Sequence, residues 1–104
     1  MTTRPLLGKP SIYAPYCVVC GRPATNQHHV IIKGMGGMDK ATERRVPTLT
    51  LCGMGNTSGC HGLAHQMRLH FRYRKGWECI ITAEPCDYQT ALESDGWRRI
   101  SHDL

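Results

Sequence analysis

The sequence predicts a small α+β domain that is stabilised by metal, and three observations lead to this class. The chain has 104 residues, of which 40% are hydrophobic, and it contains a single Phe. A core of that size usually needs a metal, a disulfide or a second subunit to stabilise it. Six cysteines are present, and four of them stand close to two pairs of histidines. The sequence pattern also changes from short strand-like segments to a helical segment and back to strands.

The first half of the chain predicts an arm, a turn and two strands. Residues 1–16 contain three prolines and little periodicity, so we expect an extended arm. Residues 17–21, Cys-Val-Val-Cys-Gly, are typical of a zinc knuckle, a tight turn that carries two thiolates. The β-branched residues in segment 27–32 predict a strand, and the alternation in segment 48–51 predicts a second, antiparallel strand. A glycine-rich loop at 34–37 lies between them.

The second half predicts a helix, a hairpin and a further short helix. A helix is expected at about 59–70, capped by Thr57 or Ser58. Segments 69–74 and 77–82 predict a strand pair that turns at the intervening Lys-Gly. Segment 87–93 predicts a short helix with its first Asp as the cap. No internal repeat or linker divides the chain. We therefore take residues 1–104 as one domain, with the arm (1–16), a core (17–70) and a C-terminal extension (71–104).

The charge distribution favours a polyanionic partner. The net charge is +5, but residues 1–77 hold eleven Lys and Arg against two acids, and residues 78–104 hold two Arg against six acids. The basic part also carries the His and Cys motifs, which suits binding to nucleic acid through its phosphates. The alternative is that these side chains only solubilise the surface.

The first residues lead into no long apolar run, so we expect no signal peptide, no membrane span and a cytoplasmic location. In a reducing compartment, cysteines at this spacing serve metal or redox chemistry more often than structural disulfides.

Four cysteines are candidates for a structural zinc site. Cys17 and Cys20 have the spacing of half a tetrahedral site. Cys52 and Cys60 are separated by seven residues, which is longer than usual, but the glycines between them allow the loop to bring both thiolates to one metal. Buried apolar cysteines with a redox dithiol are the alternative, which the absence of a βαβ pattern around Cys17 disfavours.

Three residues fall outside this pattern. Cys79 stands in a predicted strand and is expected to be a small core residue. Cys86 follows a proline near a turn, and a disulfide or second metal site joining the two is disfavoured. His70 is expected to be an ordinary surface residue.

The remaining histidines are expected to divide their roles. Successive side chains of a strand point to opposite faces, so His28 and His29 cannot both face one ligand. His61 and His65 are four residues apart and share one helix face. Cys60 is turned by about 100° from His61, so one helix can serve both a thiolate site and a histidine site. One imidazole would bind metal while its neighbour on the strand meets water.

These motifs carry a family resemblance. Cys-Val-Val-Cys, then His-His-Val, a Gly-rich loop, Leu-Cys-Gly-Met-Gly-Asn-Thr-Ser-Gly-Cys-His-Gly and a final His resemble the HNH endonucleases. More narrowly, they are similar to small zinc-containing HNH proteins of phages and prophages. The resemblance covers residues 17–70 strongly and the tail more loosely. It implies the ββα-metal fold of these nucleases (the His-Me finger), which has the strand–loop–strand–helix order expected above.

The resemblance implies roles by position. His29 becomes the general base, His28 and His61 ligands of a catalytic divalent ion, and His65 a further ligand or phosphate contact. The family's middle Asn stands just before the second strand, where this chain has Pro47. Asn56 is the nearby candidate for its role, and the alternative is that the loop is held in another way.

The function expected is therefore that of a metal-dependent DNA endonuclease, which nicks DNA by hydrolysing phosphodiester bonds at one divalent ion. Its cofactors would be a structural Zn²⁺ and a catalytic Mg²⁺, Mn²⁺, Ni²⁺ or Zn²⁺. DNA is the expected partner, and the resemblance also implies the large subunit of a phage terminase. The alternatives are a non-catalytic zinc-binding module that binds DNA or protein, and a redox dithiol protein. The candidates for phosphate contacts are basic residues: Lys33, Arg68, Arg72, Arg74 and Lys75.

Overall fold

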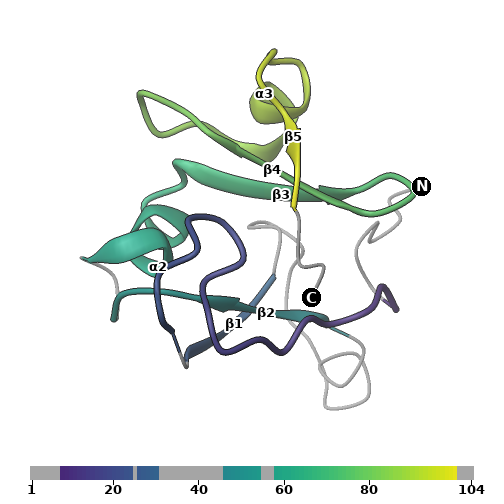
Figure 1. Cartoon of the computed structure of the whole chain (residues 1–104). Coiled ribbons are helices and arrows are strands. Elements are labelled where there is room, and N and C mark those ends of the chain that lie inside the picture. Colours follow the sequence, from purple (N-terminus) through teal and green to yellow (C-terminus); the bar gives the residue numbers. More distant parts are fainter. Residues whose placement is uncertain (1–7, 25, 31–45, 55–57, 101–104) are drawn as a thin grey trace.

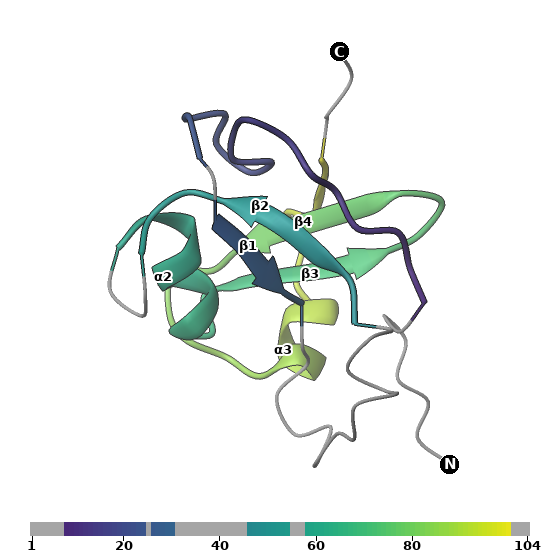
Figure 2. The same cartoon turned by 90° about the horizontal axis from the view of Figure 1, so that it is seen from below.

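The computed structural model describes residues 8–24, 26–30, 46–54 and 58–100 (Figure 1). It has two antiparallel sheets, a two-stranded ribbon in the order β1-β2 and a three-stranded sheet in the order β3-β4-β5. The ribbon lies across the face of the larger sheet, and α2 lies at one end of both (Figures 1 and 2). The class is the expected α+β. The elements are β1 (Asn26–His29), β2 (Thr48–Leu51), α2 (Gly59–His65), β3 (Leu69–Tyr73), β4 (Trp77–Ile81), α3 (Tyr88–Leu92) and β5 (Arg98–Arg99).

The β1-β2 ribbon has the antiparallel pairing that the sequence predicts, with His28 opposite Leu49. The backbone N–H of Val30 donates to the carbonyl of Pro47 at 2.9 Å and continues the pairing beyond β1. The predicted strand was longer, but residues 31–32 lie outside the described residues, as does the glycine loop at 34–37.

The described part of the arm packs along the free side of β2. Ile12 forms a parallel bridge with Leu49, and its N–H donates to the carbonyl of Thr48 at 2.9 Å. The N–H of Val18 donates to the carbonyl of Thr50 at 3.0 Å. The arm is extended as expected, and it also covers one face of the ribbon, which explains why Thr50 is fully buried although its strand alternates polar and apolar residues.

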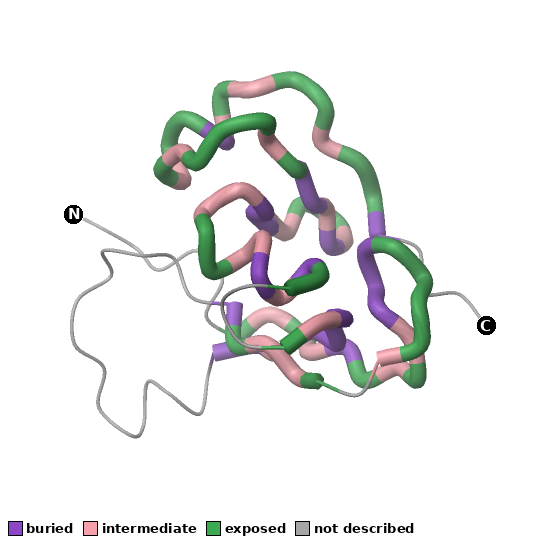
Figure 3. Tube along the Cα trace, turned by 90° about the vertical axis from the view of Figure 1, so that its left-hand side faces the viewer, coloured by how far each residue is buried: buried purple, intermediate pink, exposed green. Residues whose placement is uncertain are grey.

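The core lies between the ribbon and the larger sheet, and its buried segments are purple in Figure 3. Leu49 and Leu51 of β2 are fully buried, and Phe71 and Trp77 of the hairpin meet edge to face, with ring centroids 6.4 Å apart. The indole N–H of Trp77 donates to the carbonyl of Pro10 at 2.7 Å, so this core residue also fixes the arm.

Helix α2 is shorter than expected. It ends at His65, Gln66 is its C-cap, and Met67 adopts a left-handed φ of 61°. The chain then enters β3, so His70 is a strand residue and not the end of a helix. His70 is only 8% exposed, and its Nε2 lies 2.8 Å from the carbonyl oxygen of Met67. The expectation that His70 is a surface residue was wrong because β3 turns it inward.

The C-terminal extension follows the prediction except at its end. β3 and β4 pair as a hairpin around Lys75, whose φ is 62°. Helix α3 begins after Asp87, whose side chain accepts the N–H of Thr90 at 2.8 Å and lies in the expected cap position. β5 was not predicted, because two residues are too few for a periodic signal. None of the helices within the described ranges is long and apolar enough to cross a membrane.

Candidate metal centres

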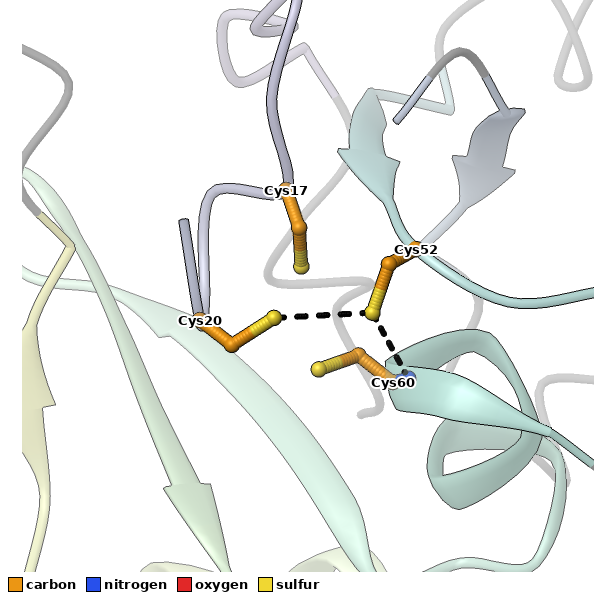
Figure 4. Close-up of side chains that lie close together, drawn as sticks. All are labelled: Cys17, Cys20, Cys52 and Cys60. Atoms are coloured by element: carbon orange, nitrogen blue, oxygen red, sulfur yellow. Dashed lines mark hydrogen bonds between the residues drawn. The ribbon is translucent and has the colours of Figure 1, made fainter. Parts of the chain in front are cut away.

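Four thiols converge from three separate segments. Cys17 and Cys20 come from the predicted knuckle, Cys52 follows β2, and Cys60 lies in the first turn of α2 (Figure 4). Their sulfur atoms lie within 4.8 Å of one another. The Sγ atoms of Cys20 and Cys52 are 3.5 Å apart, and the N–H of Cys60 donates to the Sγ of Cys52 at 3.4 Å. The sequence prediction that these four cysteines form one group is confirmed.

Two glycines allow the loop between Cys52 and Cys60 to bring both thiols to one place. Gly53 has a φ of 91° and Gly59 a φ of 60°. A Cβ on Gly59 would lie 2.6 Å from the Cα of Gly53, so the two ends of this loop touch backbone to backbone. The N–H of His61 also donates to the carbonyl of Cys52 at 2.9 Å. This contact brings Cys52 beside Cys60 and ties the end of β2 to the start of α2.

The four thiols fit a tetrahedral metal. With zinc–sulfur bonds of about 2.3 Å, sulfur atoms at the corners of a tetrahedron stand about 3.8 Å apart. The 3.5 Å between Cys20 and Cys52 is close to that value. An all-sulfur donor set is typical of structural zinc sites. This group could therefore hold a structural metal such as zinc.

The four thiols shift one another's pKa values. The side-chain hydrogen bond from Cys60 lowers the pKa of the Cys17 thiol to about 4, although burial opposes this. The same contact raises the pKa of Cys60. Burial raises the pKa of Cys20. One thiolate is therefore favoured at the centre of the group, and the remaining thiols would lose their protons as a metal binds.

A second group contains three histidines. His28 lies on β1, and His61 and His65 lie on α2. Their ring nitrogens lie within 4.8 Å of one another. The ring centroids are 5.0 Å apart for His28 and His61, 5.5 Å for His28 and His65, and 4.6 Å for His61 and His65. The expectation that one helix contributes to both groups is confirmed, since Cys60 joins the thiols and His61 the histidines.

The histidine group favours neutral imidazoles. Burial first, and then the neighbouring His61, His65 and His29, together lower the pKa of His28 to about 4. Neutral imidazole is the form that binds metal. The three histidines differ in exposure: His28 and His61 are half-buried, and His65 is exposed. A metal held here would be reached from the His65 side.

His29 is separated from this group as strand alternation predicts. It is exposed, and it is not among the residues whose ring nitrogens converge. A network that the sequence analysis missed fixes the backbone just before it. Gln27 donates to the carbonyl of Ile12 and to the hydroxyl of Thr48, both at 3.1 Å, and accepts a hydrogen bond from the hydroxyl of Thr50. Gln27 therefore joins the arm, β1 and β2 immediately before the two histidines.

The site residues predicted for the middle of the motif are only partly described. Asn56 and Lys33 lie outside the described residues. Pro47, which stands where the resemblance would place an Asn, is buried and accepts the N–H of Val30. The Gln27 network and this backbone contact hold the end of β1 in the described part of the chain.

The basic candidates differ in their surroundings. Arg68 is half-buried and donates to the carbonyl of Thr82 at 3.1 Å. The guanidinium of Arg72 pairs with Glu78 at 2.6 Å and stacks over Trp97 at 4.3 Å. Arg74 and Lys75 are exposed at the hairpin turn.

The two remaining cysteines do not join the thiol group. Cys79 is 1% exposed and is the core residue that the sequence predicts, and burial raises the pKa of its thiol. Cys86 is half-buried, with its Sγ 3.7 Å from Nε2 of His70. All six cysteines are free thiols.

No family model matches the chain, and no curated protein or solved structure matches it.

Proposed function

We propose that this protein is a metal-dependent DNA endonuclease of the HNH type, with its active site at His28, His61 and His65. One observation carries the proposal: β1 and α2 bring three imidazoles within 4.8 Å of one another, while His29, the next residue of the strand, is exposed and outside this group. A purely structural site gains nothing from a second imidazole beside a ligand. The order of strand, strand and helix is also that of the ββα-metal fold.

Three histidines suit a catalytic ion better than a structural one. Structural zinc sites are closed by four protein ligands, whereas catalytic sites use three and leave a position for water or substrate. His65 is exposed, which leaves one side of the site open to a phosphodiester.

In the proposed mechanism, His28, His61 and His65 would hold a divalent ion and His29 is the general base. When bound, the ion would supply positive charge that stabilises the phosphodiester as its bond breaks. His29 takes the proton from the water that attacks phosphorus, which a neutral imidazole does well near neutral pH. Gln27 holds the strand that positions His29, through its bonds to the arm and to β2.

We also propose that Cys17, Cys20, Cys52 and Cys60 bind a structural Zn²⁺. This ion would join the knuckle to the end of β2 and the start of α2, and so fix the helix that carries His61 and His65.

The exposed Arg74 and Lys75, with Arg68 and Lys33, would contact backbone phosphates of DNA. A monomer with one such site nicks one strand, and we propose that it acts in the cytoplasm.

Plasmid cleavage tests the proposal. Zinc-loaded protein is incubated with supercoiled plasmid in Mg²⁺, Mn²⁺, Ni²⁺ or Zn²⁺, beside the His29→Ala variant. We expect conversion to open circles by the wild-type protein, and a loss of about 10²–10⁴-fold in rate in the variant, as for removal of a general base. Binding of DNA without cleavage in all four ions would instead favour the non-catalytic zinc module. Equal rates for the two proteins would refute His29 as the base.

A further inference from the structure

The C-terminal segment contains a cavity of about 190 Å³ beside β5. Its walls come from the knuckle, β4 and β5, and none of the lining residues that the structure describes carries a carboxylate. Both Arg98 and Arg99 line it, although the C-terminal quarter of the chain is acidic overall. A water molecule occupies about 30 Å³ of liquid, so the space accommodates a phosphate group and bound water.

The strand register directs the two arginines to different neighbours. Arg98 lies opposite Cys79, on the face that packs toward the knuckle, and its guanidinium donates to the carbonyl of Val19 at 3.2 Å. Arg99 lies opposite Glu78, and its guanidinium donates to the carbonyl of Lys75 at 3.1 Å. A guanidinium has five N–H donors, so each arginine can donate to a further oxygen acceptor.

The Arg99 contact brings β5 beside the basic residues of the hairpin turn. Arg99 reaches the hairpin turn where Arg74 and Lys75 are exposed, and it approaches Gly76 so closely that a Cβ there would clash. We call Arg74, Lys75, Arg98 and Arg99 the basic ridge. Glu78, the acid nearest in register, is already paired with Arg72. Among the described residues, neither arginine of β5 pairs with a carboxylate.

The ridge lies far from the histidines. The β3-β4 turn is at the opposite end of the sheet from α2 in both views (Figures 1 and 2). The five residues of β3 span about 17 Å at 3.3–3.4 Å each. One DNA strand rises 3.4 Å per nucleotide, so the turn at Arg74 and Lys75 stands about five nucleotides from the α2 end of the sheet. Arg98 lies opposite Cys79, which pairs with Phe71 in the middle of β3, and it stands closer.

We infer that the basic ridge is a second phosphate-binding site, in which Arg98 and the adjoining cavity receive one backbone phosphate of the DNA whose scissile bond lies at the histidines. This inference rests on the proposed function, since DNA is the polyanion it invokes. The ridge holds the duplex at a second point and so orients the strand that is cut. It carries no sequence information, because phosphates are the same at every position.

A different role for Arg98 is to offset the charge of the four thiolates, since Cys17 also lines the cavity. The two roles make opposite predictions. A counter-charge would affect metal retention and leave DNA binding unchanged, whereas a phosphate contact would affect DNA binding and its dependence on salt.

The test measures binding of a short DNA duplex by fluorescence anisotropy at several salt concentrations, in the non-cleaving His29→Ala protein. The double variant Arg98→Gln, Arg99→Gln is compared with Arg72→Gln, which removes one charge from the same sheet where Glu78 already neutralises it. We expect the slope of log K against log salt to fall by about 0.9 in the double variant, which loses one phosphate contact, and to stay unchanged in the control. Zinc content and circular dichroism are measured for each protein.

An unchanged slope overturns the inference, as does a slope in the double variant equal to that of Arg72→Gln. Loss of zinc with an unchanged slope assigns the arginines to the thiol centre and also overturns it. If the double variant does not fold, titration of the His29→Ala protein with inorganic phosphate replaces it, followed by NMR at the arginine Nε–H groups. A saturable shift at Arg98 and not at Arg72 supports the site, and the absence of such a selective shift contradicts it.

Plasmid cleavage separates this result from the proposed function. Protein that cuts DNA but shows an unchanged slope refutes the ridge alone. Protein that shows the slope change but never cuts refutes the nuclease alone.

Discussion

His28 of β1 and His61 of α2 meet edge to face, with ring centroids 5.0 Å apart. The contact joins the two-stranded ribbon to the helix at the place where His65 also converges. The backbone beside it is held on both sides, by the Gln27 network before β1 ends and by the contact of His61 N–H with Cys52 at the start of α2. The three imidazoles are therefore positioned by the fold before any ion arrives.

Removing one of these imidazoles should separate metal binding from catalysis. We expect His61→Ala to lower the affinity for Ni²⁺ or Mn²⁺ by more than about 100-fold, since loss of an outer-shell partner alone costs about 10–100-fold. His29→Ala should bind the same ion normally and fail to cut. Isothermal titration of zinc-loaded protein measures the affinity. If both variants lose the ion equally, the division of roles between the histidines is wrong.

Most of the fold and much of the site could be predicted from the sequence because the signals are local. Strand alternation separated His28 from His29, and the four-residue spacing on the helix paired His61 with His65. The cap at Asp87 was also predicted from its residue type, and it accepts the N–H of Thr90 as expected. These features depend on neighbours within a few positions in the chain.

The features that the sequence did not predict depend on distant contacts. Helix-forming residues follow His65, yet the chain leaves the helix at Met67 to reach β3, so tertiary packing overrides propensity there. His70 is buried for the same reason. The ion pair of Arg72 with Glu78 requires the hairpin register. β5 exists only because β4 offers it an edge.

The thiol group should control the folding of the whole domain. Structural zinc contributes on the order of 10–16 kcal/mol in small domains, which is comparable to the total stability of a domain of this size. We expect Cys52→Ser to lose zinc and to unfold at or below room temperature. Cys86→Ser is the matched control, because Cys86 is a free thiol outside the group, and it should keep its zinc. Elemental analysis and thermal denaturation measure the outcome, and a stable, zinc-free Cys52→Ser protein would contradict the structural role.

The pKa of His28 predicts how stability depends on pH when no divalent ion is bound at the histidines. Its folded pKa of about 4 lies below the ordinary value of 6.5. As the pH falls, the unfolded chain takes up the proton first, so the free energy of unfolding falls between about pH 6.5 and pH 4. From pH 7 to pH 5, the titration of His28 lowers the free energy of unfolding by about 2 kcal/mol.

His28→Gln removes this titration. Urea denaturation at pH 7 and pH 5 gives the free energy of unfolding of both proteins. Between these pH values it should fall by about 2 kcal/mol more in the wild-type protein than in the variant. Both proteins contain the acid-sensitive thiol centre, so its contribution cancels in this comparison. Identical losses in the two proteins would show that His28 titrates normally in the folded state.

The two glycines of the Cys52–Cys60 loop predict where the thiol group is most sensitive to a single methyl group. A Cβ on Gly53 would clash with the backbone carbonyl of Ser58, and neither atom can move without opening the loop. We expect Gly53→Ala to separate Cys52 from Cys60, and therefore to weaken zinc retention and lower the melting temperature sharply. Gly21→Ala is the control, because its φ of 83° is also left-handed but nothing lies within 4 Å of the added Cβ.

The control should carry only the cost of a left-handed alanine, about 1–2 kcal/mol, and should keep its zinc. Competition with a chromogenic chelator measures retention in both variants. The strain of a left-handed alanine is common to both variants. Any additional loss of zinc from Gly53→Ala is therefore due to the close approach of Gly53 and Ser58. If both variants release zinc at the same rate, the contact between Gly53 and Ser58 does not hold the four thiols together.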